Sequence, residues 1–307
     1  MNSIKLVLLT KHGDLRGGWK ILLFIVLHGA VAAALMVPLS GMSLLTTLTT
    51  SAALLASGLV TTLVMTRFIN RKPFGAVGLM IHPWMLRQLL AGFFLGFLMV
   101  AGIFLVEAGL GYAALSWHGL SIGDAVRIAG LSFLTLGFAA AWEELTFRGY
   151  MFQSLIQSIT FLPAMMVFAA LFSAAHWGNP NCTALALVNV GLAAVLFSFS
   201  YQKTRSLWLP IGLHLGWNFT QTTVCSFPTS GNDFSSLQLF ELTQTGPGWV
   251  TGGEFGPEGG ILATVAPVVC AWHILKSTMY ATPHGLITLD SLEDILGPTI
   301  NAGGSRT

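Results

Sequence analysis

The chain has 307 residues, of which 54% are hydrophobic and only 8% are charged. A soluble domain carries about 25% charged residues, so this chain has too few to cover a globule with solvated side chains. Its mean hydropathy of +0.74 agrees with that conclusion, and lipid is therefore the solvent expected for most of the surface. The formal net charge of +2 is too small to indicate a nucleic-acid-binding protein.

Eight stretches of the chain are long and apolar enough, or nearly so, to cross a membrane. A helix needs about 20 apolar residues to cross a hydrocarbon layer about 30 Å thick. We place the eight stretches at about 21–40, 44–66, 88–112, 124–146, 162–177, 183–201, 207–226 and 259–277. They predict an all-α, polytopic membrane helical bundle of about eight transmembrane helices, with residues 1–307 forming a single integral membrane domain.

The positions of the basic residues predict the orientation of the bundle. Lysine and arginine concentrate in the cytoplasmic loops of membrane proteins. With eight spans and a cytoplasmic N-terminus, all 14 lysines and arginines except Arg127 fall on or near the cytoplasmic side. The segment 227–258 contains acidic residues but neither lysine nor arginine. We therefore expect both termini inside (N-in and C-in), an extracytoplasmic loop at 227–258 and a short cytoplasmic tail at 281–307.

An ionisable residue inside a membrane helix is costly and is by default a functional hypothesis. Glu143, Glu144 and Arg148 lie toward the inner end of the fourth predicted span. Glu144 and Arg148 are four residues apart and share a helix face, so Arg148 can hold and orient Glu144. Glu143 points about 100° away and can face a cavity, where it suits a general base acting on water. The alternative is an ion pair that only stabilises the helix end.

Two further motifs place polar groups in later spans. His176 ends the fifth span in the sequence FSAAH at residues 172–176. His214 and Asn218 are four residues apart, so both project from one face of the seventh span. Together they could donate hydrogen bonds to a developing oxyanion. Taken singly, each motif is also compatible with a structural histidine or with hydrogen bonds between helices.

In combination, the motifs resemble the CPBP intramembrane proteases, a family that includes the CAAX prenyl endopeptidases and the bacterial bacteriocin-processing or Abi proteins. The family pattern is EExxxR, then FxxxH, then HxxxN, on successive parts of a helical bundle. This chain has EELTFR at 143–148, FSAAH at 172–176 and HLGWN at 214–218. Three further stretches look like bacterial members: HWGNPN at 176–181, SLWLP at 206–210 and TGGEFGPE at 251–258. The resemblance covers about residues 67–277, the protease-like core.

The resemblance implies a role for each motif residue. Glu143 matches the glutamate that activates the nucleophilic water, and His176 matches the histidine that positions this water. His214 and Asn218 match the pair that stabilises the oxyanion. The remaining motif residues have supporting roles: Glu144, Arg148 and Phe172.

One distance conflicts with a simple arrangement of straight spans. Glu143 is expected near the inner end of its span. A fifth helix running straight outward from about Leu162 would place His176 ~21 Å away along the membrane normal. The two side chains could not then share a water molecule. The fifth helix must therefore be tilted, broken or begin within the membrane, and Pro163 and the uncharged stretch 149–160 leave room for this.

The resemblance leaves two mechanisms open for the activation of water. Family members are commonly described as metalloproteases, and by ligand type Glu143, His176 and His214 would form a zinc triad. The chain lacks the HExxH motif, which places two histidines on one helix face. We expect a glutamate–histidine pair that acts directly on water and requires no cofactor, with bound zinc as the alternative.

The resemblance thus implies an intramembrane endopeptidase, an enzyme that hydrolyses a peptide bond with a glutamate- and histidine-activated water. The expected partners are membrane lipid and a protein or peptide substrate, prenylated or bacteriocin-like, and not nucleic acid. The bacterial type of sequence implies a multi-pass protein of the plasma membrane, the bacterial inner membrane. Two alternatives stay open: a non-catalytic immunity or scaffold protein on the same fold, and an ion-coupled transporter, since intramembrane Glu and His form proton relays.

Overall fold

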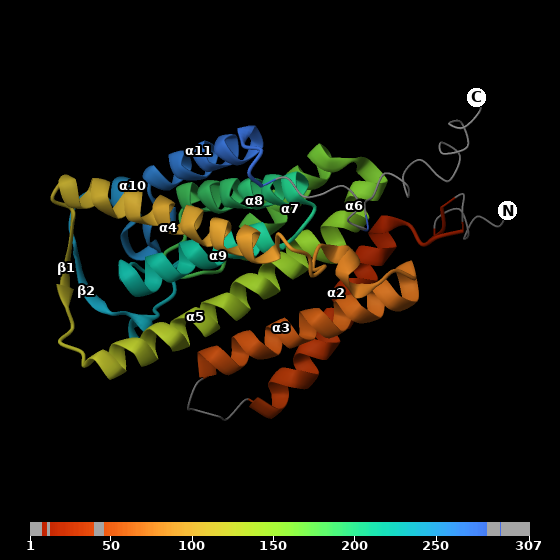
Figure 1. Ribbon diagram of the computed structural model, residues 1–307, viewed down its shortest axis with the longest axis horizontal. Helices are drawn as coiled ribbons and strands as arrows, with labels where there is room; N and C mark the ends of the chain where they lie inside the picture. The colour runs from red at the N-terminus through yellow and green to blue at the C-terminus, as the bar shows by residue number, and fades with distance from the viewer. Residues whose placement is uncertain (1–7, 11–12, 40–45, 281–288, 290–307) are drawn as a thin grey trace.

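The structure is a computed structural model of the chain and describes residues 8–10, 13–39, 46–280 and 289. Most of the predicted cytoplasmic tail lies outside the described residues, as do Lys5 and Lys11. The described residues form a bundle of mostly apolar helices with one short two-stranded sheet at its end (Figure 1).

The helices and strands follow one another in a simple order. The first half contains α2 (Gly17–Met36), α3 (Thr46–Val64), α4 (Met85–Gly109), β1 (Ala113–Trp117), α5 (Ile122–Glu144) and α6 (Met151–Ile159). The second half contains α7 (Phe161–Ala175), α8 (Ala184–Thr204), α9 (Trp208–Phe219), β2 (Phe240–Gln244), α10 (Gly248–Thr251) and α11 (Leu262–Lys276). Single π-helical turns extend three of these helices, over Met65–Asn70, Leu145–Tyr150 and Thr220–Val224.

The predicted class, an all-α polytopic membrane protein, is confirmed. Each of the eight predicted spans contains a helix. In the described part of the chain, five helical runs are long and apolar enough to cross a membrane: Gly17–Met36, Thr47–Asn70, Met85–Gly109, Ile122–Ile159 and Ala184–Thr204. The other three predicted spans form the shorter helices α7, α9 and α11. Of these, α9 is buried among the others from Leu209 to Gly216.

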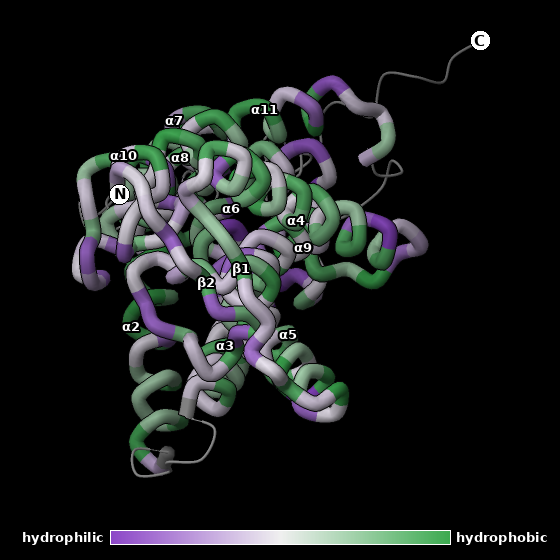
Figure 2. Tube along the Cα trace, turned by 90° about the vertical axis from the view of Figure 1, so that its left-hand side faces the viewer, coloured by the Kyte–Doolittle hydropathy of each residue, from purple (hydrophilic) through white to green (hydrophobic). Residues whose placement is uncertain are grey.

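The outward faces of the long helices carry large apolar side chains. Leu22, Ile25 and Val26 of α2 are exposed, as are Leu98 and Leu105 of α4. Figure 2 shows hydrophobic colouring along most of the helices, on outer as well as inner turns. In water such a surface would be unfavourable, whereas against lipid tails it costs nothing. The same composition therefore gives both the core of the bundle and its lipid-facing surface.

The fourth predicted span is longer than the sequence indicated, and this corrects the position of its motif. The helical run that begins as α5 passes through a π-helical turn and continues as α6 to Ile159. Gly149 carries non-helical dihedral angles (φ −77°, ψ −115°) and marks a kink within the run. The glutamate motif therefore lies within the helical run and not at its end. The predicted end at 146 was wrong because the uncharged stretch after Arg148 reads equally well as a loop.

The extended run also removes the distance conflict between Glu143 and His176. After α6 the chain reverses at Thr160, which adopts a left-handed conformation (φ 71°), and α7 runs back along the bundle (Figure 1). Nearly equal numbers of residues separate this reversal from Glu143 and from His176. Because both helices rise about 1.5 Å per residue, the two side chains reach a similar level without a broken helix.

Glycines bring α4 and α9 into close contact. A Cβ atom on Gly92 or Gly96 of α4 would collide with the backbone of α9, and one on Gly212 or Gly216 of α9 would collide with the backbone of α4. Small residues at a helix interface permit this approach and so increase the dispersion contacts that hold membrane helices together. The contact fixes the position of α9 and hence of His214, which α9 carries.

The end of the bundle that carries the two-stranded sheet is closed by an ordered connection. β1 pairs with β2 in an antiparallel register from Ala113 opposite Gln244 to Trp117 opposite Phe240, and this sheet lies at one end of the molecule in Figure 1. The segment 227–258, predicted as an extracytoplasmic loop, contains β2, α10 and two tight turns. Which side of the membrane this segment faces stays a prediction.

The close contact between α4 and α9 predicts the effect of one added methyl group. We expect Gly216→Ala to push the two helices apart and to lower stability by about 1–3 kcal/mol, the usual cost of overpacking. The control is Gly102→Ala on α4, where nothing lies within 4 Å of an added Cβ atom. Thermal unfolding of the detergent-solubilised protein measures both effects. Equal melting temperatures for the two variants would contradict the packing argument.

Candidate active site

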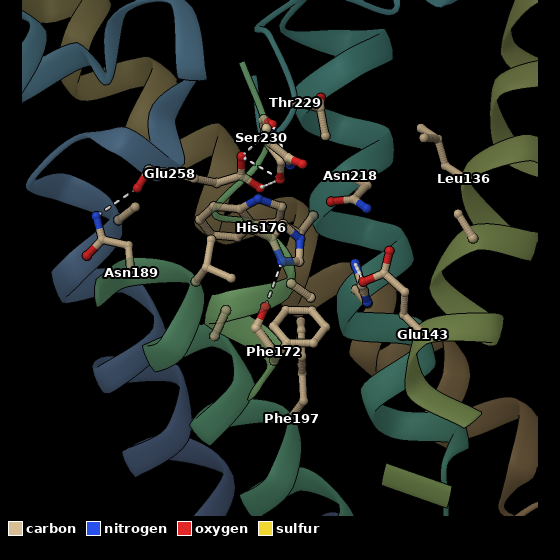
Figure 3. Close-up of a pocket in the computed structure, with 18 of the residues that line it drawn as sticks. Leu136, Glu143, Phe172, His176, Asn189, Phe197, Asn218, Thr229, Ser230 and Glu258 are labelled. Carbon is tan, nitrogen blue, oxygen red and sulfur yellow. Dashed lines mark hydrogen bonds and ion pairs between the residues drawn. The ribbon is translucent and has the colours of Figure 1, made fainter. Parts of the chain in front are cut away.

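A cavity of about 320 Å³ lies between the helices, below the connection that precedes α11 (Figure 3). The four predicted catalytic residues all line it: Glu143, His176, His214 and Asn218. Aromatic and aliphatic side chains from α4, α5, α7, α8 and α11 form much of the remaining wall. The structure thus brings together residues from three helices that are far apart in sequence, in an enclosed space of mixed polarity.

The two adjacent glutamates of α5 have different surroundings. Glu144 is completely buried, and its Oε1 atom accepts hydrogen bonds from Arg148 (3.1 Å) and from Nδ1 of His214 (3.0 Å). Glu143 lies about 100° around the helix, where its side chain is 21% exposed and faces the cavity. Its Oε2 atom lies 3.9 Å from Nε2 of His214 and has no hydrogen-bond partner within the protein. The carboxylate of Glu144 is therefore held in place, whereas that of Glu143 is available to groups in the cavity.

Arg148 is buried in the bundle and not at an interface. Its side chain is 1% exposed and forms an ion pair with Glu144. The guanidinium carbon lies 4.4 Å from the ring centroid of Phe172 and 5.1 Å from that of Phe197. Two aromatic faces therefore enclose the charge, and such cation–π contacts are strongest where the cation is desolvated.

The end of α7 sets the orientation of His176. Nδ1 of His176 lies 2.8 Å from the backbone carbonyl oxygen of Phe172. A carbonyl can only accept, so Nδ1 carries the proton in this contact. In the neutral ring, Nε2 then presents a lone pair, and Figure 3 shows the ring within the cavity. The ring of Phe172 packs against that of His176 with a centroid distance of 4.9 Å, so one residue contacts both the histidine and Arg148.

His214 and Asn218 occupy successive turns of α9 and both face the cavity, as their spacing predicted. The ring of His214 stacks on that of Phe197 at a centroid distance of 5.0 Å and an angle of 16°. Glu144 accepts from its Nδ1, which leaves Nε2 directed toward Glu143. The side chain of Asn218 points into the same space in Figure 3. The two side chains therefore line the same cavity.

The cavity also contains a carboxylate to which sequence analysis gave no role. Glu258 lies in a turn before α11, and its side chain faces the cavity. Burial raises the pKa of Glu258 above its usual value, and hydrogen bonds from Gln221 and Ser230, with nearby His176, only partly oppose this shift. The feature of the sequence that could have indicated this site is the run TGGEFGPEGG at 251–260, in which Glu258 lies among glycines with no lysine or arginine beside it.

The side chains present do not match a metal site. In the described part of the chain, no three His, Cys, Asp or Glu side chains gather in a way that could hold a metal ion. Glu143, His176 and His214, the proposed zinc triad, line one cavity without meeting that condition. The Nδ1 atoms of His176 and His214 both contact an oxygen, so the Nε2 atom is the free nitrogen of each ring. No step of the chemistry below passes through a metal.

The fold and the cavity define a multi-pass membrane protein with a polar site enclosed by its helices. Residues 125–220 match the family model of the type II CAAX prenyl endopeptidase Rce1-like proteins. The matched segment includes all three motifs, and the match confirms the resemblance to CPBP intramembrane proteases that they indicated. At the level of the family it supports a CAAX-type intramembrane endopeptidase acting on a peptide in a lipid environment. A search of curated proteins gave no match.

The buried ion pair predicts a large loss of stability on removal of the arginine. Arg148→Ala removes the arginine partner of the buried Glu144, and breaking a buried pair in this way costs about 3–5 kcal/mol. The control is Arg127→Ala, because Arg127 forms a pair of the same type with Asp124 on the surface, at 67% and 50% exposure. We expect a clear fall in melting temperature for the first variant and almost none for the second. A stable Arg148→Ala variant would show that the pair does not hold the bundle together.

Proposed function

We propose that the chain is an intramembrane endopeptidase in which Glu143 and His176 activate a water molecule for attack on a peptide bond. The observation that carries this proposal is the difference between the two adjacent glutamates. Glu144 is completely buried and its Oε1 atom is held by Arg148 and His214, whereas Glu143 is 21% exposed and faces the cavity with an unpartnered Oε2 atom. A general base needs a free lone pair within reach of the reacting water, and Glu143 has one.

The proposed reaction conserves every proton. The water oxygen attacks the carbonyl carbon while Glu143 accepts the water proton, which gives a tetrahedral intermediate with a negatively charged oxygen. The C–N bond then breaks, and the proton held by Glu143 passes to the departing amine. His176, whose Nε2 presents a lone pair in its neutral form, accepts a hydrogen bond from the same water and fixes its position.

His214 and Asn218 supply the donors for the charged oxygen. The amide N–H of Asn218 can donate directly. Because Nδ1 of His214 donates to Glu144, donation from its Nε2 requires protons on both ring nitrogens. The carboxylates of Glu144 and Glu143 balance the resulting positive charge. Preorganised donors of this kind stabilise the transition state more than the bound substrate, since the carbonyl oxygen gains its charge only during the reaction.

For the membrane and the substrate, the proposal names a class only. Much of the cavity wall is apolar, including Leu136, Leu196 and Phe197, which suits a peptide segment with apolar side chains. The bacterial type of sequence favours the plasma membrane. A prenylated or a bacteriocin-like peptide remains the proposed substrate class.

The role of Glu143 is tested by an isosteric amide. Glu143→Gln keeps the shape of the side chain but cannot accept the water proton, so we expect cleavage to fall by at least about 100-fold while the melting temperature stays unchanged. The measurement is cleavage of a quenched fluorescent peptide library by the protein in proteoliposomes, with products located by mass spectrometry. Glu241→Gln, which alters an exposed carboxylate of β2, is the matched control. Full cleavage by Glu143→Gln would remove the residue from the mechanism and favour a non-catalytic scaffold.

The oxyanion role of Asn218 predicts a specific kinetic change. Loss of one such donor typically costs about 100- to 1,000-fold in turnover. Asn218→Ala should therefore lower kcat by about that factor and leave KM nearly unchanged. Asn218→Asp should be as damaging or worse, because it can place a negative charge beside the one that forms. Steady-state kinetics separate these effects. A change mainly in KM would instead assign Asn218 to substrate binding.

A further inference from the structure

Glu258 occupies a site that is built into the fold around its carboxylate. The side-chain amide of Asn189 on α8 donates to the backbone carbonyls of Glu258 and Gly260, at 2.8 Å each. The hydroxyl of Thr264 on α11 donates to the other side of the same amide (2.7 Å). The turn that carries Glu258 is thus tied to two helices, which fixes where its side chain enters the cavity.

Close backbone contacts reinforce this turn. Gly256 has a positive φ of 94°, and a Cβ atom there would collide with the carbonyl oxygen of Pro228. Gly231 likewise has a positive φ, and its Cβ would collide with the carbonyl oxygen of Pro180, in the turn that follows His176. Only glycine allows both the conformation and the approach. The connection that carries Glu258 therefore packs directly on the end of α7.

Neutral donors hold the carboxylate of Glu258. Its Oε2 atom accepts from the backbone N–H of Ser230 (2.6 Å), from the Ser230 hydroxyl (3.1 Å) and from the side-chain amide of Gln221 (3.2 Å). Its Oε1 atom accepts only from the same hydroxyl (3.1 Å). Ser230 makes both contacts from a left-handed backbone conformation (φ 49°), a strained arrangement of the kind found at functional sites. Oε1 retains acceptor capacity toward the cavity.

The charge of Glu258 lacks a cationic partner among the described residues that line the cavity. None of them is a lysine or an arginine, and Arg148 is already paired with Glu144. The other titratable groups that line the cavity are Glu143, His176 and His214. A carboxylate removed from water is costly unless a positive charge compensates it. Hydrogen bonds from neutral groups orient Glu258 but supply no full charge.

We propose that Glu258 binds a positively charged group of the substrate, namely the side chain of lysine or arginine or a free amino terminus. The inference rests on the proposed peptidase function and names the substrate class of that same site. Figure 3 places Glu258 and Glu143 on opposite sides of the cavity, with His176 between them in this view. The cationic group therefore binds on the side of the cavity closed by the loop, and the scissile bond lies toward α5 and α9. A metal ion does not fit, because no three metal-binding side chains gather among the described residues.

Binding can be measured separately from cleavage in the Glu143→Gln background. The probes are three fluorescein-labelled apolar nonapeptides that differ at one position, which is lysine, norleucine or glutamate. Their affinities for the protein in nanodiscs are measured by fluorescence anisotropy. We expect the lysine peptide to bind at least about tenfold more tightly than the norleucine peptide, and the glutamate peptide to bind most weakly. Scanning the variable position along the peptide locates the site relative to the bound segment.

Two variants in the same loop provide the contrast. Glu258→Gln should abolish the preference for lysine over norleucine, whereas Glu254→Gln, which alters an exposed carboxylate, should leave it intact. Glu258→Asp keeps the charge and should retain part of the preference. If Glu258→Gln fails to fold, the comparison of peptides on the parent protein still decides whether a cationic subsite exists, and Glu258→Asp tests the part that Glu258 plays in it.

Three outcomes overturn the proposal. Equal affinity for the lysine and norleucine peptides would show that no cationic subsite exists. A preference that survives Glu258→Gln would place the subsite elsewhere, and a uniform loss of affinity for all three peptides would make Glu258 a structural residue. With Glu143 restored, a bound lysine peptide that is not cleaved would contradict the peptidase function and leave the subsite standing. Cleavage without a preference for lysine would contradict the cationic subsite and leave the peptidase function standing.

Discussion

The ion pair between Glu144 and Arg148 is the interaction on which the rest of the site depends. It joins two turns of one helical run, and the same carboxylate oxygen also accepts from His214 of α9. The rings of Phe172 and Phe197 cover the guanidinium and so attach α7 and α8 to the same charge. Four helices therefore meet at one buried group. Because a charge in an apolar interior is stable only with such partners, any movement of one helix is opposed by the cost of exposing this pair.

This arrangement gives the two adjacent glutamates different surroundings, and the chemical role that we propose falls to Glu143. Glu144 forms the ion pair with the buried arginine, and its neighbour Glu143 faces the cavity. An adjacent pair of glutamates on a helix gives this difference automatically, since successive residues point about 100° apart. The proposed roles of His176 and His214 follow the same logic. Each ring has one nitrogen bonded to a fixed acceptor and the other directed into the cavity.

Much of this could be predicted from the sequence, and the exceptions have physical causes. Hydropathy located the helices because a lipid-facing helix must be apolar throughout, and spacing alone predicted the Glu144–Arg148 pair. The length of the fourth span could not be predicted, since the chain after Arg148 is uncharged and contains Gly149, which suits a loop as well as a kink. Glu258 was not recognised because its position depends on hydrogen bonds from Ser230 and Gln221, which come from other parts of the chain.

Because the chain reverses at Thr160, the relative positions of Glu143 and His176 depend on the number of residues between them. Glu143 and His176 stand at a similar level only because the segments on either side of this reversal have nearly equal length. Adding one residue to α6 would shift one side chain by about 1.5 Å and rotate it by about 100°, which moves it off the cavity wall. Substitutions in the segment 150–175 therefore preserve this alignment, whereas insertions and deletions disturb it. The two-stranded sheet of β1 and β2, which carries no residue of the cavity wall, is free of this constraint.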